Sequence, residues 1–304
     1  MLPFQVQILG CGSSTPTLRH NPSAQIVRAH NRLFLFDCGE GTQRELRRHS
    51  IAMSHLQHIF ITHLHGDHWF GLPGLLSTLA LLGCRNTIYI HAFSELEKML
   101  APILHFHLQE DGMRVEFVAI SPKGGEVVYE DKEFTITTLA LHHRVPCVAY
   151  VCREKMALPH IRRDMIDFLK IPHYAIKDIK EGAGWQTADG IFYPHERLVT
   201  PANRPRTYAY MTDTQPCPEH AEALRGIDLL YHEATFCNDK TARAEETGHT
   251  TTSQAASFAK QIQCKRLMIG HFSARYTDDT QFLKEAIEIF PQSVLANEGV
   301  TINV

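Results

Sequence analysis

The chain has 304 residues, of which 44% are hydrophobic and 21% are charged, and this composition excludes a disordered or fibrous protein. A formal net charge of −3 excludes a globally basic surface, so any contact with nucleic acid would be local. Apolar runs such as residues 75–83 are too short to cross a bilayer, and the N-terminus has the pattern of a strand rather than of a signal peptide. We therefore expect a cytoplasmic protein with no membrane partner.

Strands and helices alternate along the first half of the chain. Short runs rich in β-branched and aromatic residues predict strands over residues 4–9, 24–29, 32–37, 57–62, 87–92, 115–120, 133–141 and 146–152. Helical periodicity predicts helices over residues 42–49, 72–82 and 94–107.

The second half repeats this order after an interruption. It predicts strands over residues 206–212, 228–233, 265–270 and 300–304, and helices over residues 219–224, 251–262 and 279–290. Strands in series followed by helices, in two halves, predict an α+β fold in which two sheets pack together with helices outside them. Residues 153–205 interrupt the order with charged patches and a Pro-rich exit, so we interpret them as an insertion into a single domain of residues 1–304.

Cysteine and histidine have informative distributions. Eight cysteines are scattered without a CxxC pair, which predicts reduced, mostly buried thiols rather than a disulfide framework or a zinc ribbon. The chain also contains 20 histidines, and several of them cluster. These clusters need an explanation beyond ordinary surface or core positions.

The segment HLHGDH places four metal-ligand side chains within six residues, directly after a predicted strand. Imidazole and carboxylate groups are ligands for zinc or a similar divalent ion. If the strand extends that far, His63 and His65 point to one side. Gly66 then allows a turn that brings Asp67 and His68 back. Because four such close ligands cannot all reach one tetrahedral ion, we expect two adjacent ions, with the first two histidines on one and Asp67 and His68 on the other.

Further ligands must come from distant strand ends, and four candidates follow apolar runs in the same way: His142, His143, Asp213 and His271. An aspartate between two ions can bridge them and hold them about 3.5–4 Å apart, as in two-metal hydrolases. Each candidate alone is weak evidence, because most isolated histidines are ordinary core or surface residues. Together with HLHGDH they predict a two-metal site.

Two more residues accompany this set. Glu233 ends a predicted strand, and His249 directly precedes a predicted helix. Neither is needed as a ligand, so we expect a role in proton transfer or in orienting the site. The alternative is a surface ion pair for Glu233 and a helix cap for His249.

These motifs together resemble those of the metallo-β-lactamase superfamily and, within it, of the ribonuclease Z family. The resemblance lies in LGCGSSTPTLRHNPSA, FLFDCGEGTQREL, THLHGDHWFGLPGLL, HHRVPCVAYV, AYMTDT, HEATF, GHTTTSQAA and GHFSARY, which follow the family's order over most of the chain. HEATF and the histidine–threonine motif are more specific to this family than HLHGDH, which thioesterases and lactamases share. The resemblance implies a four-layer αββα sandwich with a protruding arm inserted at residues 153–205.

The resemblance also implies a site. The family's ligand positions fall on His63, His65 and His143 for one zinc ion, on Asp67, His68 and His271 for the other, and on Asp213 as the bridge. His143 is implied rather than His142 because it directly precedes RVP, as the family's ligand does, and His142 remains a possible neighbour. Asp67 is implied as the general base.

The implied activity is removal of the 3′ trailer from precursor tRNA by a two-metal endoribonuclease, which leaves a 3′-hydroxyl on the tRNA and a 5′-phosphate on the trailer. Asp67 would accept a proton from the attacking water. His249 is our candidate general acid, oriented by Glu233 and kept protonated by it, because a nearby carboxylate raises the pKa of a histidine.

In the family the arm grips the tRNA, and members usually form homodimers, so we expect both partners here. Residues 153–197 contain eight Lys and Arg against seven Asp and Glu, which is a weak positive charge for binding phosphates. Basic residues on one face could suffice, and the candidates are Arg162, Arg163, Lys170, Lys177 and Lys180.

Two rival functions share part of this pattern. A hydrolase of small molecules would use the same ligands, but it has no need of HEATF, His249 or an arm. A non-catalytic binding protein that retains a metal site is the other rival, and the complete ligand set disfavours it.

Overall fold

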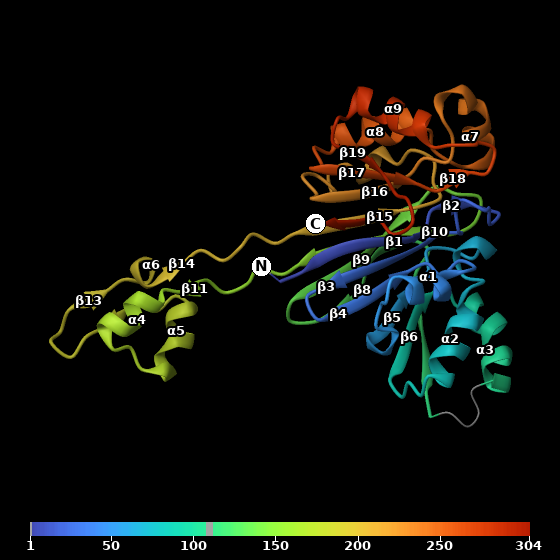
Figure 1. Ribbon diagram of the computed structural model, residues 1–304. Helices are drawn as coiled ribbons and strands as arrows, with labels where there is room; N and C mark the ends of the chain where they lie inside the picture. The colour runs from blue at the N-terminus through green and yellow to red at the C-terminus, as the bar shows by residue number, and fades with distance from the viewer. Residues whose placement is uncertain (1, 108–111) are drawn as a thin grey trace. The chain divides into compact units, whose positions relative to one another are not determined.

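The computed structural model describes residues 2–107 and 112–304, which form two compact units (Figure 1). The small unit consists of residues 130–135 and 153–205. The large unit consists of residues 2–129, 136–152 and 206–304, within the described part of the chain.

The large unit is built on two seven-stranded sheets. The first has the order β20 (Thr301–Asn303), β1 (Phe4–Gly10), β3 (Ala24–Ala29), β4 (Arg32–Phe36), β5 (Leu56–Phe60), β6 (Thr87–Ala92) and β7 (Arg114–Ala119). The second has the order β19 (Ser293–Leu295), β17 (Arg266–Gly270), β16 (Leu229–Glu233), β15 (Thr207–Met211), β10 (Cys147–Glu154), β9 (Phe134–Leu141) and β8 (Gly124–Glu130). Strands β4 to β7 run parallel, and so do β15, β16, β17 and β19.

Aromatic side chains fill the space between the sheets. The ring of Phe36 lies 6.0 Å from that of Tyr210, and the ring of Phe60 lies 5.3 Å from that of Tyr150. All four rings are fully buried. Large apolar side chains on the inner faces are what two packed sheets require.

Helices cover the outer face of each sheet (Figure 1). Helices α1 (Thr42–Arg48), α2 (Leu72–Leu81) and α3 (Glu95–His107) bury Leu46, Leu75 and Leu100 against Leu35 and Ile59 of the first sheet. Helices α8 (Thr252–Gln261) and α9 (Thr280–Ile289) cover the second sheet, and α7 (Thr241–Thr247) precedes α8. The layer order is αββα, as predicted.

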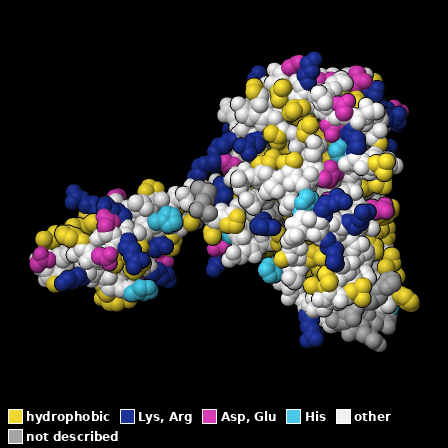
Figure 2. Space-filling model, in the orientation of Figure 1, with side chains coloured by type: hydrophobic (Ala, Val, Ile, Leu, Met, Phe, Trp, Pro, Cys, Tyr) yellow, Lys and Arg dark blue, Asp and Glu magenta, His cyan; other side chains and the backbone are white. Residues whose placement is uncertain are grey.

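The small unit has a core of its own, formed by Ile171, Ala175, Ile179 and Leu198. Its elements are α4 (Arg163–Leu169), α5 (Ile176–Lys180), α6 (His195–Leu198) and the strand pairs β11 (His160–Ile161) with β14 (Val199–Thr200) and β12 (Trp185–Gln186) with β13 (Phe192–Tyr193). On the face shown in Figure 2, basic and acidic side chains are intermixed over this unit.

Some predicted elements were wrong or missing. The helix predicted over residues 219–224 is a 3₁₀ helix, η4 (Pro218–His220), followed by turns, because six residues are too few to sustain an α-helix without support. The strand predicted over residues 57–62 ends at Phe60, so the next residues are loop. Strands β8 and β19 and helix α7 were not predicted, since β8 is half-buried and glycine-rich at its start and β19 has three residues.

The eight cysteines are all free and buried, as predicted. Among residues 2–107 and 112–304 we find no helix with the length and apolar character needed to span a membrane.

Candidate metal centre

The predicted ligands follow the ends of strands in both sheets. His63 lies in the loop after β5, Asp213 lies just after β15, and His271 lies just after β17. These strands belong to the parallel parts of their sheets. In parallel sheets, ligand-binding sites form at the carboxyl ends of the strands. Local sequence therefore places each ligand at a strand end, and the packing of the two sheets brings the ends together.

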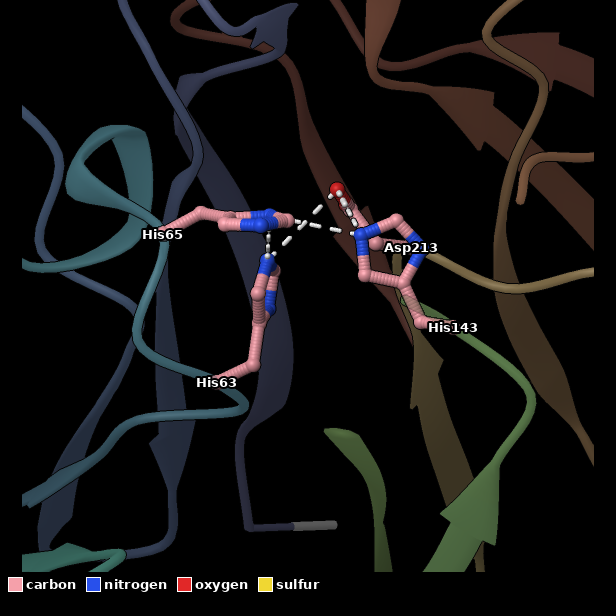
Figure 3. Close-up of side chains that lie close together, drawn as sticks. All are labelled: His63, His65, His143 and Asp213. Carbon is pink, nitrogen blue, oxygen red and sulfur yellow. Dashed lines mark hydrogen bonds and ion pairs between the residues drawn. The ribbon is translucent and has the colours of Figure 1, made fainter. Parts of the chain in front are cut away.

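One cluster contains three histidines and an aspartate (Figure 3). The Nδ1 atom of His65 lies 3.0 Å from Nε2 of His63 and 3.3 Å from Nε2 of His143. The Oδ2 atom of Asp213 lies 3.6 Å from Nε2 of His63 and 3.7 Å from Nε2 of His143. Four donor atoms from three segments of the chain thus face one point.

A second cluster uses the other oxygen of Asp213. Its Oδ1 atom lies 3.0 Å from Nε2 of His271 and 3.3 Å from Nε2 of His68. The Oδ2 atom of Asp67 lies 3.5 Å from Nε2 of His68 and 3.7 Å from Nε2 of His271. Asp213 therefore belongs to both clusters, with one carboxylate oxygen in each.

The donor atoms fit divalent metal ions. Two ligands bound to zinc at tetrahedral angles lie about 3.3 Å apart, which matches the spacing in both clusters. Within the described residues, Nε2 of His68 and Nε2 of His271 are buried and make no hydrogen bond of suitable geometry, although both lie close to Oδ1 of Asp213. Buried polar atoms are rarely left unpaired, so these two nitrogens call for a ligand that the protein itself does not supply.

Neighbouring groups hold the imidazoles in a ligating orientation. Asp37 accepts a hydrogen bond of 2.7 Å from Nδ1 of His68, and the backbone carbonyl of Gly248 accepts one of 2.9 Å from Nδ1 of His143. The hydroxyl of Thr235 lies 2.8 Å from Nδ1 of His271. Partners of this kind fix the tautomer that leaves Nε2 for a metal.

Asp37 is a site residue that the sequence reasoning missed. It is buried, lies just after β4, and also accepts hydrogen bonds from Tyr210 and from the backbone N–H of Thr62. Its φ of 54° is in the left-handed region, which a non-glycine residue adopts only where the surroundings demand it. The available signal was its place in FLFDCGEG, an aspartate directly after an apolar strand.

Burial and neighbouring charge set the protonation of the ligands. Burial lowers the pKa of His63 well below its ordinary value, and the charge of His68 lowers it further, so the imidazole is neutral as a ligand must be. Burial alone would raise the pKa of Asp213, but the charges of His271 and His68 outweigh it and keep the carboxylate ionised.

Glu233 and His249 form a buried pair beside both clusters. Nδ1 of His249 lies 2.8 Å from Oε1 of Glu233, and the His249 ring lies 5.1 Å from that of His143 and 5.4 Å from that of His271. Burial lowers the pKa of His249, but the charge and hydrogen bond of Glu233 outweigh it and raise that pKa to about 9. The alternative of a surface ion pair for Glu233 is wrong, since its side chain is 0% exposed. The alternative of a helix cap for His249 is also wrong, because Thr251 caps α8.

The metal clusters open into a cavity of about 440 Å³ that is lined by His65, Asp67, Asp213 and His249. The backbone N–H of Ser14, in the opening loop, donates a hydrogen bond of 2.7 Å to Oδ2 of Asp67. A substrate in this cavity would meet both clusters and the Glu233–His249 pair together.

Other candidate residues lie elsewhere. His142 is outside both clusters, because its Nε2 lies 2.6 Å from Oε1 of Glu219 on the surface. In the small unit, Arg162 is paired with Asp164 at 2.6 Å, and Lys177 lies 3.9 Å from Glu181. The expected His63–His65 alternation along a strand was wrong, since the strand ends at Phe60 and the turn at residues 66–68 is a 3₁₀ helix, η2 (Gly66–His68).

Comparisons with known proteins agree with this fold. The family model described as anti-Pycsar protein Apyc1 matches residues 4–146, and the beta-lactamase superfamily domain matches residues 198–272. Among solved structures, the human tRNase Z short form is 25% identical with a TM-score of 0.70 and 98% of each chain covered. The metallo-beta-lactamase fold protein YhfI from Bacillus subtilis has a TM-score of 0.68 at 19% identity, over 99% of this chain and 100% of that one.

The fold and the ligand clusters define a metallo-β-lactamase-fold protein, with the divalent-metal site that this fold carries. The ribonuclease Z of Phocaeicola vulgatus is 47% identical over 100% of this chain and 98% of that protein, and the ribonuclease Z of Bacteroides fragilis is 46% identical over 100% of each. The chain belongs to the ribonuclease Z family and is an enzyme, a nuclease, as the sequence motifs predicted.

Proposed function

We propose that this chain is a zinc-dependent endonuclease that removes the 3′ trailer from precursor tRNA, leaving a 3′-hydroxyl on the tRNA and a 5′-phosphate on the trailer. One observation carries the proposal. Two ligand clusters share Asp213 and adjoin the Glu233–His249 pair, in a chain 47% identical over its whole length to a protein named ribonuclease Z. The human relative is named tRNase Z, which supports tRNA as the substrate.

The donor set supports two metal ions, and we assign zinc because histidine nitrogen and carboxylate oxygen are among its usual ligands. The residues that would hold them are His63, His65 and His143 for one ion, Asp67, His68 and His271 for the other, and Asp213 for both. When bound, the two ions supply positive charge that polarises the scissile phosphate and makes a nearby water more acidic.

The protein's own groups would move the protons. Asp67, held by the N–H of Ser14, accepts a proton from the attacking water while the oxygen of that water forms a bond to phosphorus. The bond between phosphorus and the 3′ oxygen breaks, and His249 donates a proton to that departing oxygen. Glu233 orients His249 and keeps it protonated at neutral pH, consistent with a His249 pKa of about 9.

We also propose that residues 153–205 form a tRNA-binding arm and that the protein works as a cytoplasmic homodimer. Among the residues that the structure describes, Arg163, Lys170 and Lys180 have no carboxylate within ion-pair distance, so they are available for phosphate groups. Sedimentation equilibrium tests the dimer, since a particle of only 34.5 kDa at micromolar concentration would contradict it.

The decisive experiment incubates the metal-replete protein with a labelled precursor tRNA that carries a 3′ trailer, with Asp67→Ala as control. We expect a single cut near the discriminator base or directly after CCA, a 3′-hydroxyl on the tRNA, and no cut by the variant. Hydrolysis of bis(p-nitrophenyl) phosphate without any cut in the tRNA would contradict the proposal and favour a small-molecule phosphodiesterase.

A further inference from the structure

A second cavity of about 370 Å³ adjoins the metal-lined one. We name it the basic pocket and define it by Arg144, Arg243, Arg275, Thr247, Ser273 and His249. Hydroxyl groups are added by Ser13, Ser14, Thr15 and Thr235, and no Asp or Glu of the described part of the chain lines the pocket. A concave site with three guanidinium groups, several hydroxyls and no carboxylate has the chemistry of an anion site.

Three separate parts of the large unit build the basic pocket. Arg144 follows the expected ligand His143, Arg243 lies on α7, and Arg275 lies on the turn after β18 (Phe272–Ser273). Strand β18 pairs with β2 (Gly12–Ser13), which brings the opening loop to the same place. The pocket is therefore a product of tertiary packing rather than a run of basic residues.

The arginines are available to an anion. Arg243 is paired with Glu246 at 2.7 Å, but the two side chains are 45% and 67% exposed, so solvent screens the pair and it is weak. Within residues 2–107 and 112–304, Arg144 and Arg275 have no carboxylate within ion-pair distance. The aliphatic part of the Arg144 side chain lies over Gly248: a Cβ atom added to Gly248 would be 3.5 Å from Cγ of Arg144. Because His249 follows Gly248 in the chain, the Arg144 side chain lies next to His249.

The basic pocket and the metal-lined cavity meet at His249. Both cavities are lined by Ser14, Arg144 and His249. An RNA strand whose scissile phosphate lies at the metal clusters can therefore continue past His249 into the pocket. In the proposed function His249 protonates the departing 3′ oxygen, so the nucleotide that keeps this oxygen lies on the His249 side.

We propose that the basic pocket binds the phosphate on the 5′ side of that nucleotide, one position upstream of the scissile phosphate, and that Arg243 and Arg275 determine this preference. The inference rests on the proposed function, because the direction of the strand follows from His249 acting as the acid. The basic pocket is then a substrate-binding site outside the metal ligands.

Two dinucleotides and two variants test the proposal. The substrates are a dinucleotide with a single internal phosphate and the same dinucleotide with an added 5′-phosphate. We expect the holoenzyme to cleave the 5′-phosphorylated substrate with a kcat/KM about tenfold higher, the size of one charge-assisted contact at an exposed site. Arg243→Gln and Arg275→Gln should each remove most of this advantage and leave hydrolysis of bis(p-nitrophenyl) phosphate unchanged.

Arg225→Gln is the matched control, because Arg225 is also exposed and paired with a glutamate three residues away, Glu222. It should keep the full advantage. If Arg243→Gln and Arg275→Gln also keep it, or lose hydrolysis of bis(p-nitrophenyl) phosphate to the same degree, the basic pocket has no such role.

Inhibition separates a failure of this inference from a failure of the proposed function. Uridine 5′-monophosphate should inhibit hydrolysis of bis(p-nitrophenyl) phosphate competitively, with a Ki about fivefold or more higher in Arg275→Gln than in Arg225→Gln. An enzyme that cuts no RNA contradicts the proposed function. Even then, the ratio of the Ki values in Arg275→Gln and Arg225→Gln still shows whether the basic pocket binds a phosphate. Equal Ki values in the two variants would overturn the inference.

Discussion

Asp213 is the residue on which the two ligand clusters depend. One of its oxygens faces His63 and His143, and the other faces His68 and His271. It is buried, and the charges of His271, His68 and His63 outweigh the effect of burial and keep its pKa low. A carboxylate in this position can hold two ions close together, whereas each histidine serves one ion.

We expect Asp213→Ala to lose metal from both clusters. Each cluster would lose one of its donor atoms. The histidines of the two clusters would then lie close together without the negative charge of Asp213, which attracts cations. Metal analysis by mass spectrometry after exhaustive dialysis should give well under one ion per chain, against about two for the wild type if the site is filled as proposed. A variant that keeps two ions and a normal rate would rule out the bridging role.

His249 can be separated from the ligands by its effect on turnover. His249→Ala should lower kcat for tRNA cleavage by about 10²–10⁴-fold, the usual contribution of a general acid, while metal content stays unchanged. The matched control is Glu233→Gln, which retains shape but removes the charge that raises the pKa of His249, so its loss should be smaller at low pH than at high pH. Loss of metal from His249→Ala would instead indicate a ligand.

At the scale of elements, the opening loop between β2 and β3 is held by a buried ion-pair network. The ring of His20 lies between Oδ2 of Asp279 at 3.0 Å and Oε2 of Glu298 at 2.9 Å. Arg19 adds a 2.6 Å ion pair to Asp279. Because Ser14 in the same loop donates to Asp67, the network holds a segment that touches the candidate metal centre.

This network makes stability depend on pH. Burial lowers the pKa of His20, but hydrogen bonds to Asp279 and Glu298 raise it to about 9, above the 6.5 of an unfolded histidine. A raised pKa in the folded state contributes stability that is complete below pH 6.5 and is lost as the pH rises through about 9. Solvent reaches part of this network and screens its charges, so the contribution to stability is below about 3 kcal/mol.

We expect His20→Gln to be less stable than the wild type at pH 6 and to approach it at pH 10. Urea unfolding of both proteins at the two pH values measures the difference in the free energy of unfolding. Leu18→Ala is a control in the same loop, because Leu18 is fully exposed and has no titratable group, and its difference from the wild type should not change with pH. A gap for His20→Gln that stays constant or widens as the pH rises would contradict the assignment.

At the scale of the whole molecule, the two units have separate cores. Ile171, Ile179 and Leu198 belong to the core of the small unit. Among residues 2–107 and 112–304, the core that supports α1 to α3 contains only residues of the large unit. Removing the small unit therefore does not open that core. Strands β11 and β14 pair with each other, so a deletion should remove both.

We expect replacement of residues 160–200 by a short Gly-Ser linker to raise the KM for precursor tRNA by about tenfold or more, as lost phosphate contacts require, while hydrolysis of bis(p-nitrophenyl) phosphate is retained. Binding titrations at several salt concentrations would show how many phosphate contacts the arm makes. Equal losses on both substrates would contradict a role confined to tRNA binding.

Much of the fold follows from local pattern. The predicted bounds of β3 and β6 coincide with the observed ones, because each is a short apolar run between clear turn signals. The helix preceded by Thr251 was predicted from periodicity, and a capping box with Gln254 begins it. Strand β8 was missed because its residues are only half-buried and alternate weakly, so its place in the sheet depends on pairing with a distant segment.

The sequence by itself determined the layered fold, the ligand types and their positions at strand ends, since apolar periodicity and clustered imidazoles are local properties. Only the tertiary structure decided which groups meet. Asp37 and His68 are 31 residues apart, and Arg144, Arg243 and Arg275 come from three elements. The physical reason is that convergence of side chains depends on how two sheets and their loops pack, and no spacing along the chain records that packing.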